Sequence, residues 1–318
     1  MARRELGQLS LADGLVGGIG GNGRLDRLCG LVDWAAFDGE LSGVYASARG
    51  RPSYPPLCLF KCLLLQQWYR LSDPELEEAL ADRLSFRRFV GLSLGDAAPD
   101  HSTISRFRSL LADRGLAEEL FSALHRQLDA KGFLVKAGTM IDATVVQADA
   151  VPLPHERSRE RSDQDAGFTL TRRGYRLGYK AHLAVDCGSR LIRTALLTPA
   201  NVHDADERHV FLLMQGDEQV LYADKAYDNA SIRWTLENQG IANGILQRRS
   251  GGQPLSASAI AANVFLSKRR VAIEALFGLM KRSYGYSRVR YRSLVRNAVQ
   301  LHLLCMALNM RRLLVLVR

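Results

Sequence analysis

Three acidic residues stand where their surroundings suggest metal chemistry. Asp142 lies in TMIDATVVQAD and Asp224 in VLYADKAYD, and both segments are apolar, β-branched runs typical of buried strands. An ionised carboxylate in such a strand is costly unless it is paired or binds a cation. Glu274, in RRVAIEALFGLMKR, supplies a third acid. Together the three predict a divalent-cation site, in which carboxylates hold Mg²⁺ for phosphoryl transfer.

The segment around Glu274 is predicted to be a helix with one charged stripe. At about 100° per residue, four polar positions share one side of the helical wheel: Ser267, Arg270, Glu274 and Lys281. The apolar side comprises Ala272, Ile273, Leu276, Leu279 and Met280. One acid between two cations suits a metal ion next to a polyanion. A solvated face with an ordinary Arg–Glu pair would give the same pattern, but the two strand aspartates upstream favour the functional interpretation.

These segments resemble the DDE transposases of bacterial insertion sequences, specifically those of insertion sequence family five. The family motif is Arg, three residues, Glu, six residues, Lys, present here as Arg270, Glu274 and Lys281. The fuller motif has a Tyr three residues before the Arg, where this chain has Ser267. Also similar are MIDATVV, YADKAYD, GYKAHLAVD, TPANVHD and the stretch from YPPLCLF to PDHSTISRFR, over roughly residues 50–315.

The resemblance implies a transposase that binds the terminal inverted repeats of its element and cuts and rejoins DNA. Asp142, Asp224 and Glu274 would be the catalytic residues and would hold two Mg²⁺ ions, for which Mn²⁺ can substitute. The expected partner is double-stranded DNA, as terminal repeat and as target. We also expect a homodimer or higher homo-oligomer, because two element ends must be cut in concert.

The charge of the chain agrees with a polyanionic partner. Its formal net charge is +10 and its pI is near 9.6. Between positions 268 and 296 there are nine basic residues, and Glu274 is the only acid. A surface that served solubility alone would mix both signs. The candidate DNA contacts in this region are Ser267, Lys268, Arg269, Arg270, Lys281, Arg288, Arg290 and Arg292.

The order of predicted elements indicates an α/β protein whose RNase H-like catalytic domain follows an all-α DNA-binding domain. Three early strands and then alternating strands and helices predict a mixed five-stranded sheet with flanking helices. The expected strands are 140–146, 178–185, 191–197, 220–223 and 241–246, with helices at 204–214 and 231–239. The expected domains are an N-terminal arm (1–50), a helical domain (51–132) and the catalytic domain (133–318), with a flexible basic insertion at about 155–177.

Within the helical domain, Asp100 is predicted to cap a helix that begins HSTISRFRS. A capped polar helix that follows a helix and a turn suits a helix-turn-helix motif, in which this helix reads the major groove. A plain surface helix has the same pattern, and the family resemblance favours the first interpretation. The candidate DNA contacts are Ser102, Thr103, Arg106 and Arg108.

The N-terminal arm and the basic insertion have open roles. The Gly-rich arm contains an apolar segment, 28–37, which we expect to support contacts between subunits. The insertion either orders on DNA or is a solvated loop. Its basic residues are Arg157, Arg159, Arg161, Arg172, Arg173 and Arg176.

Several other polar residues are given structural roles. Asp204 and Glu207 fit an acidic cap at a helix start, which makes His203 a structural or supporting residue. His182 and Lys180 share one face of a predicted strand. The acids that could replace a member of the triad are Asp149, Asp186 and Asp228.

The five cysteines show no paired spacing, which indicates a reduced compartment, here the bacterial cytoplasm. No apolar stretch reaches membrane-spanning length without charged or polar interruptions. Two further functions share this pattern: an RNase H-like nuclease that cuts DNA without strand transfer, and a domesticated regulator that binds DNA without chemistry.

Overall fold

The computed structural model describes residues 4–8, 11–15, 19, 21–45, 53–149, 163–171, 174–249 and 253–317. The chain forms two compact units, one of Met1–Gln127 with His302–Arg318 and the other of Leu128–Leu301. The last 17 residues, which we had expected in the catalytic domain, therefore group with the N-terminal unit. The long C-terminal helix α12 (Leu294–Leu316) contributes residues to both units.

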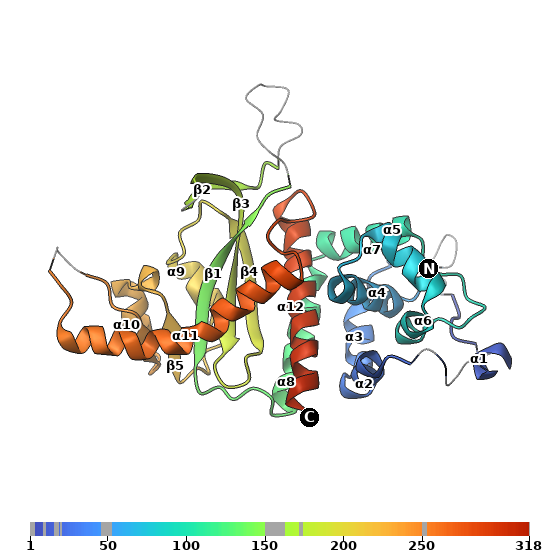
Figure 1. The fold of residues 1–318 in the computed structure, drawn as a ribbon, viewed down its shortest axis with the longest axis horizontal. Helices are drawn as coiled ribbons and strands as arrows, with labels where there is room; N and C mark the ends of the chain where they lie inside the picture. The colour runs from blue at the N-terminus through green and yellow to red at the C-terminus, as the bar shows by residue number, and fades with distance from the viewer. Residues whose placement is uncertain are drawn as a thin grey trace, which may run out of the picture. The chain divides into compact units, whose positions relative to one another are not determined.

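The described part of the first unit is helical (Figure 1). Proline and N-cap residues explain where these helices begin. Pro56 is the first residue of α4, Ser72 and Glu75 form a capping box at the start of α5, and Asp100 caps α7. The predicted start at Asp100 is confirmed. The helices before α12 are α1 (Leu11–Leu15), α2 (Gly23–Leu31), α3 (Trp34–Leu41), α4 (Pro56–Tyr69), α5 (Asp73–Asp82), α6 (Leu84–Val90), α7 (His101–Asp113) and α8 (Leu116–Ala130).

The apolar part of the N-terminal arm lies in the core of its own chain. Phe37 is fully buried, and its ring centroid lies 5.2 Å from that of Phe60 in α4. The Trp34 ring meets Phe89 of α6 edge-on at 5.5 Å. Part of the apolar surface of residues 28–37 is therefore covered within the chain by α4 and α6, and the expected contact of this segment with a neighbouring subunit stays a prediction.

The second unit is built on a six-stranded sheet. Strand β3 pairs antiparallel with β1, β2 and β4, whereas β1 pairs parallel with β5, and β5 with β6. The order β4-β3-β1-β5-β6, with three antiparallel strands followed by two parallel ones, is that of an RNase H-like fold, as expected. The strands are β1 (Thr139–Gln147), β2 (Gly167–Thr171), β3 (Gly174–Asp186), β4 (Ile192–Pro199), β5 (Val220–Ala223) and β6 (Ala242–Ile245).

Strand β2 is the element that the sequence did not predict. It lies inside the expected flexible insertion, and β3 begins four residues earlier than expected, so the two form a hairpin that extends the sheet. The described part of the insertion is thus regular structure stabilised by strand pairing. The interpretation of Arg157, Arg159, Arg161, Arg172 and Arg173 lies outside the described residues.

The two faces of the sheet carry different partners. On one face, Ile141, Leu221 and Ala223 pack in a buried cluster with α9 (Glu207–Leu213) and α10 (Ala230–Asn238). Because side chains alternate along a strand, Asp142 lies on the opposite face from Ile141. There α11 (Ala257–Ser283) contacts β1 and β5, and Figure 1 shows it running beside these strands. The face of the sheet that carries Asp142 is therefore the face that α11 contacts.

Among the described helices, α12 is the one long and apolar enough to cross a membrane. In its apolar window 78% of the residues are buried inside the protein. Such burial is typical of a core helix, and Trp68 Nε1 of α4 donates a hydrogen bond to the Ala307 carbonyl of α12 at 2.8 Å.

Close strand packing gives a first prediction. A Cβ on Gly178 of β3 would lie 2.1 Å from the Val146 carbonyl oxygen, a backbone atom that cannot rotate away. We expect Gly178→Ala to lower the free energy of unfolding by about 1–3 kcal/mol. Gly278→Ala in α11 is the control, because its Cβ would meet only the movable end of Arg282. Urea denaturation measures both variants, and equal stabilities would contradict the strand register.

Candidate active site

Asp142, within strand β1, and Asp224, directly after strand β5, lie side by side on neighbouring parallel strands. Met140 pairs with Tyr222, and each aspartate follows two residues later. Both acids face Arg270 of α11. Arg270 Nη2 donates to Asp142 Oδ2 at 2.8 Å, and Arg270 Nη1 lies 3.7 Å from Asp224 Oδ1. The fold thus brings together two acids that are 82 positions apart in the sequence.

The two carboxylates sit in different environments. Asp142 is mostly buried, and burial raises its pKa although the Arg270 charge and the Ala143 N–H act in the opposite direction. Asp224 is more exposed, and its Oδ1 accepts the N–H of Lys225 at 2.6 Å, which caps the short 3₁₀ helix η2 (Lys225–Tyr227). Two carboxylates that meet at the edge of a sheet provide the hard oxygen donors that divalent cations such as Mg²⁺ prefer.

Glu274 is not part of this pair. It is exposed on α11, one turn beyond Arg270 and so about 6 Å further along the axis. Among the described residues, no three acids, histidines or cysteines are close enough to share a metal ion. The structure therefore brings Asp142 and Asp224 together and leaves the expected third acid outside. Carboxylates repel one another, and the Arg270 guanidinium is shared between the two aspartates alone.

A second polar cluster surrounds Lys180 of β3. The helix α9 is capped by Asp206, so the expected cap at Asp204 is wrong. Asp204 instead forms an ion pair with Lys180 at 2.8 Å, and Lys180 also donates to the Val202 carbonyl at 2.6 Å. Burial, and after it the charges of Asp142 and Asp204, raises the pKa of Tyr227. Tyr227 thus lies within the electrostatic influence of both Asp142 and Asp204.

Sequence reasoning missed this role of Asp204, although a signal was present. Lys180 and His182 are two residues apart on a strand, so their side chains lie on the same face of the sheet. If that face is covered by the core, both polar side chains need partners there. A buried lysine needs an acid, and Asp204 is the nearby one. His182 is buried and its Nε2 lies 2.9 Å from Thr198 Oγ1. Burial lowers the pKa of His182 to about 4.

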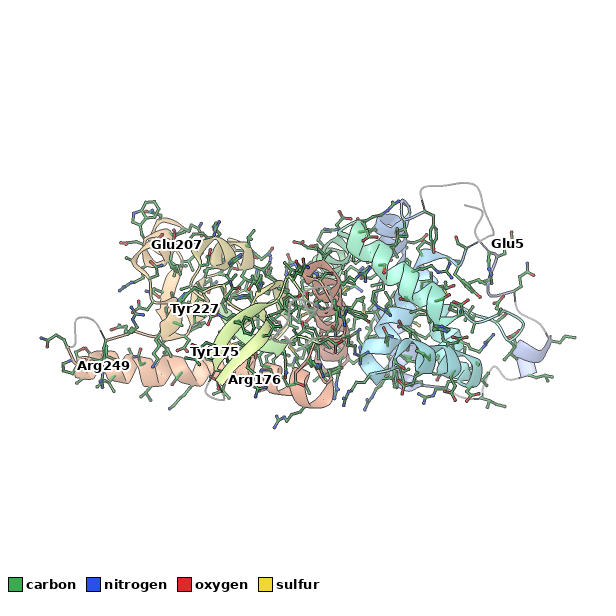
Figure 2. All side chains as sticks on the ribbon, turned by 90° about the horizontal axis from the view of Figure 1, so that it is seen from above. Glu5, Tyr175, Arg176, Glu207, Tyr227 and Arg249 are labelled. Carbon is green, nitrogen blue, oxygen red and sulfur yellow. The ribbon has the colours of Figure 1, made fainter. Side chains whose placement is uncertain are left out.

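Side chains beside this cluster join helices to each other. Glu207, labelled in Figure 2 with Tyr227, accepts a hydrogen bond from Ser231 Oγ at 2.6 Å and one from Asn229 Nδ2 at 3.3 Å. These bonds hold the start of α10 against α9. His203 Nδ1 accepts the N–H of Ala205 and so stabilises the connecting turn, a structural role as expected.

The three acids that could have replaced a triad member have other partners. Asp186 is buried and accepts N–H groups of Lys136 and Ser189, which fixes a turn. Asp149 lies 3.4 Å from Arg288. Asp228 pairs with Arg233 at 3.3 Å and accepts the N–H of Arg248. None of these acids contacts Arg270 in the described structure.

The basic candidates differ in accessibility. Most of them are exposed or half-buried, and burial lowers the pKa of Lys281. Arg176 is described and lies at the start of β3, next to the exposed Tyr175 (Figure 2). The exposed candidates on and after α11 are Ser267, Lys268, Arg269, Arg288, Arg290 and Arg292. Arg270, by contrast, is buried against the aspartates.

In the helical unit, α7 presents Arg106 to solvent and keeps Ser102 and Thr103 half-buried at its start. Asp100 accepts hydrogen bonds from Ser102 Oγ and the Thr103 N–H, and these bonds lower its pKa to about 2. Arg106 Nη2 donates to Ser102 Oγ at 2.7 Å. This end of α7 is therefore a preformed polar surface.

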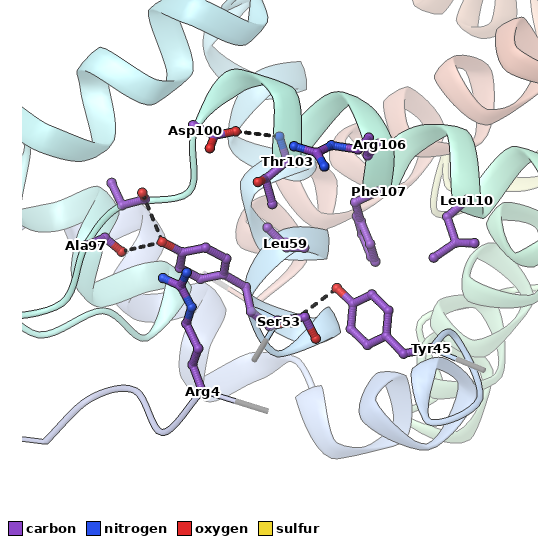
Figure 3. A pocket seen from close by; sticks show the side chains of 12 residues that line it. Arg4, Tyr45, Ser53, Leu59, Ala97, Asp100, Thr103, Arg106, Phe107 and Leu110 are labelled. Atoms are coloured by element: carbon purple, nitrogen blue, oxygen red, sulfur yellow. Dashed lines mark hydrogen bonds between the residues drawn. The ribbon is translucent and has the colours of Figure 1, made fainter. Parts of the chain in front are cut away.

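A cavity of about 630 Å³ lies beside the same end of α7 (Figure 3). Tyr54 forms one wall, where its hydroxyl donates to the carbonyls of Ala97 and Ala98 at 3.0 and 3.1 Å. The Arg4 guanidinium lies 4.3 Å from the centroid of the Tyr54 ring. Thr103 and Arg106 also line the cavity, so it adjoins the candidate DNA contacts.

Arg108 does not have the expected exposure. Its side chain is buried, with Nη1 at 3.0 Å from Asp73 Oδ2 and Nη2 at 3.0 Å from Gln66 Oε1. The expectation that Arg108 contacts DNA is wrong, because α7 turns this position toward α4 and α5 with Phe107 and Ile104.

Comparison with known proteins identifies the family. Residues 135–310, more than half of the chain, match the family described as Transposase DDE domain. Residues 19–110 match the family described as Transposase domain (DUF772). The chain is a DDE transposase. DDE transposases depend on divalent metal ions, act on DNA, and cleave and transfer DNA strands.

Solved structures of transposases show a distant likeness. A piggyBac transposase synaptic complex with hairpin DNA, solved by cryo-EM, aligns with 10% identity over 89% of this transposase and 72% of that chain, with a TM-score of 0.45. A crystal structure of a pre-cleavage Mos1 transpososome aligns with 12% identity over 76% and 77%, and a Mos1 strand transfer complex with 13% over 83% and 81%, each with a TM-score of 0.21. Family membership rests on the sequence match.

The burial of Arg108 gives a second prediction. Arg108→Ala should lower the free energy of unfolding by about 3 kcal/mol, because it removes the buried cation that compensates the charge of Asp73. Arg106→Ala on the exposed side of the same helix removes the same charge and should change stability by less than about 0.5 kcal/mol. Denaturation curves compare the two, and similar losses would show that Arg108 is not a structural residue.

Proposed function

We propose that this transposase mobilises an insertion sequence of family five, binding its terminal inverted repeats, and that Asp142, Asp224 and Glu274 are its catalytic acids. The observation that carries the assignment of the site is the convergence of Asp142 and Asp224, from two neighbouring parallel strands, on one guanidinium. The spacing of Arg270, Glu274 and Lys281 supports family five.

The residues fit a divalent metal site. Asp142 and Asp224 already share a cationic partner, so their oxygens point toward a common region. We propose that they hold Mg²⁺, with Mn²⁺ as a substitute, and that two ions bind with Glu274 as the third acid. When bound, such ions make water or a DNA 3′-OH more nucleophilic and neutralise charge on the leaving oxygen.

Backbone N–H groups of the transposase orient the acids, and its basic side chains would orient the DNA. The Ala143 N–H donates to Asp142 Oδ1 at 2.8 Å and the Lys225 N–H holds Asp224, so neither carboxylate has to be ordered during the reaction. Glu274 shares the helix side of Arg270, where a turn of the side chain can bring it toward the pair. Arg270, Lys281 and the exposed basic residues of 267–292 would contact phosphates on either side of the cleavage point.

The DNA-binding role of the helical unit rests on α7. Its capped start presents Ser102, Thr103 and Arg106, and a polar helix start of this kind can read base edges in the major groove. We propose that a homodimer or higher homo-oligomer assembles two element ends, because concerted cleavage requires two active sites. The expected location is the bacterial cytoplasm.

The catalytic assignment gives a third prediction. Asp142→Asn, Asp224→Asn and Glu274→Gln should each reduce cleavage and strand transfer at least about 1,000-fold, because each removes charge that holds the metal ions. Binding to element ends should be retained. Gel assays with labelled ends, Mg²⁺ and a plasmid target measure both steps separately.

Asp149→Asn is the matched control, since it removes a strand-end carboxylate that pairs with Arg288 instead. Its cleavage should stay close to that of the wild type. Normal cleavage by a triad variant would remove that residue from the site. Cleavage without any joining by the wild type would identify a nuclease rather than a transposase.

The DNA contacts give a fourth prediction. Arg106→Ala should reduce the preference for the terminal repeat over random DNA by about 10-fold, the value of one base contact. Lys281→Ala should weaken binding to both DNAs equally and make the salt dependence shallower by about one unit. Fluorescence anisotropy at several salt concentrations measures these effects. An unchanged preference in Arg106→Ala would exclude α7 as the reading helix.

A further inference from the structure

Arg270 differs from its basic neighbours in burial. Its side chain is only 8% exposed, whereas Lys268 and Arg269 on the same helix are exposed. A buried guanidinium is costly unless acids compensate it, and two adjacent acids repel each other unless a cation lies between them. Arg270 and the aspartate pair therefore stabilise one another, which makes the arginine part of the site and not a surface contact.

The hydrogen bonding of Arg270 is incomplete. One Nη is bonded to Asp142, the other lies 3.7 Å from Asp224, and the buried Nε has no hydrogen-bond partner among the described residues. A bidentate pair with parallel bonds would be stronger and more specific. An unpaired buried donor raises the free energy of this arrangement. The guanidinium is thus held mainly by charge, in a contact that a better cation can replace.

The oxygens in contact with Arg270 are the ones that a shared metal ion needs. Asp142 Oδ2 and Asp224 Oδ1 both face the guanidinium. A divalent ion carries twice its charge and binds carboxylate oxygens at about 2.0–2.6 Å, closer than a guanidinium nitrogen can approach. The two cations repel each other, so they cannot occupy the space between the aspartates together.

We propose that Arg270 is the resident counter-cation of the Asp142–Asp224 pair and that binding of a divalent ion displaces its guanidinium. This inference rests on the proposed metal site. Once displaced, the planar guanidinium would present its N–H donors beside the site, where a DNA phosphate oxygen is the matching acceptor. The exchange needs only rotation of the flexible arginine side chain, because α11 remains packed on β1 and β5. Arg270 is therefore a positioning residue that links metal loading to phosphate binding.

The test is the affinity of the full-length protein for Mn²⁺ without DNA, measured by electron paramagnetic resonance. Removing a competing charge next to a carboxylate changes its cation affinity by roughly 10-fold or more. Arg270→Gln should therefore bind Mn²⁺ at least about 10-fold more tightly than the wild type. Arg269→Gln removes the same charge from the neighbouring exposed position and should change the affinity by less than about twofold, because solvent screens it. Unchanged or weaker binding by Arg270→Gln would overturn the exchange.

Asp142→Asn separates this proposal from the proposed function. If Asp142→Asn does not weaken Mn²⁺ binding, the metal site itself is wrong. If it abolishes binding while Arg270→Gln matches the wild type, only the exchange is wrong.

A second measurement needs no folded Arg270→Gln variant. In the wild type, the arginine Nε–H resonance assigned to Arg270 by comparison with Arg270→Lys should shift during a Mg²⁺ titration, in step with metal binding. A resonance that stays fixed at saturating Mg²⁺ would overturn the displacement.

Discussion

Two adjacent carboxylates in a folded protein repel each other unless a cation compensates their charge, and the arrangement of the catalytic unit follows from this requirement. Asp142 is on a central strand, where burial raises its pKa, and Asp224 ends the adjacent strand. Asp142 is mostly buried, so its charge must be compensated, and Asp224 adds a second negative charge beside it. A helix must therefore bring a basic residue to this face of the sheet, and α11 does so with Arg270. The order of strands matters because β1 and β5 are parallel neighbours, and their register places Asp142 and Asp224 side by side.

The opposite face of the sheet makes that arrangement rigid. Ile141 and Ala223, which immediately precede the two aspartates, are anchored in the apolar cluster with α9 and α10. Each acid is thus fixed by the burial of its neighbour, and the strand period sends it to the other side. Asp204 and Lys180 tie the loop after β4 to β3. Packing and charge act on adjacent residues of the same strand, so the core positions the site directly.

Much of this could be predicted because it follows local rules. The apolar, β-branched runs indicated β1 and β5, and Asp100 indicated a helix start through its capping chemistry. Strand β2 was missed because its sequence has few apolar anchors and it is stabilised by pairing with β3. The partners of Arg108 and Arg270 were missed for another reason. A helical wheel gives the side on which a residue lies, but not which acid from a distant segment meets it there.

Both strand aspartates share one local feature, which explains their chemical type. Each accepts a hydrogen bond from the N–H of the residue that follows it, Ala143 for Asp142 and Lys225 for Asp224. Such a small ring closes only when a single methylene separates the carboxylate from the backbone. A glutamate has one methylene more and would swing its oxygens away from this bond. Glu274 stands on a helix, faces no such ring and has a longer distance to cover. Side-chain length is therefore set by the element that carries each acid, so aspartate and glutamate are not interchangeable at these three positions.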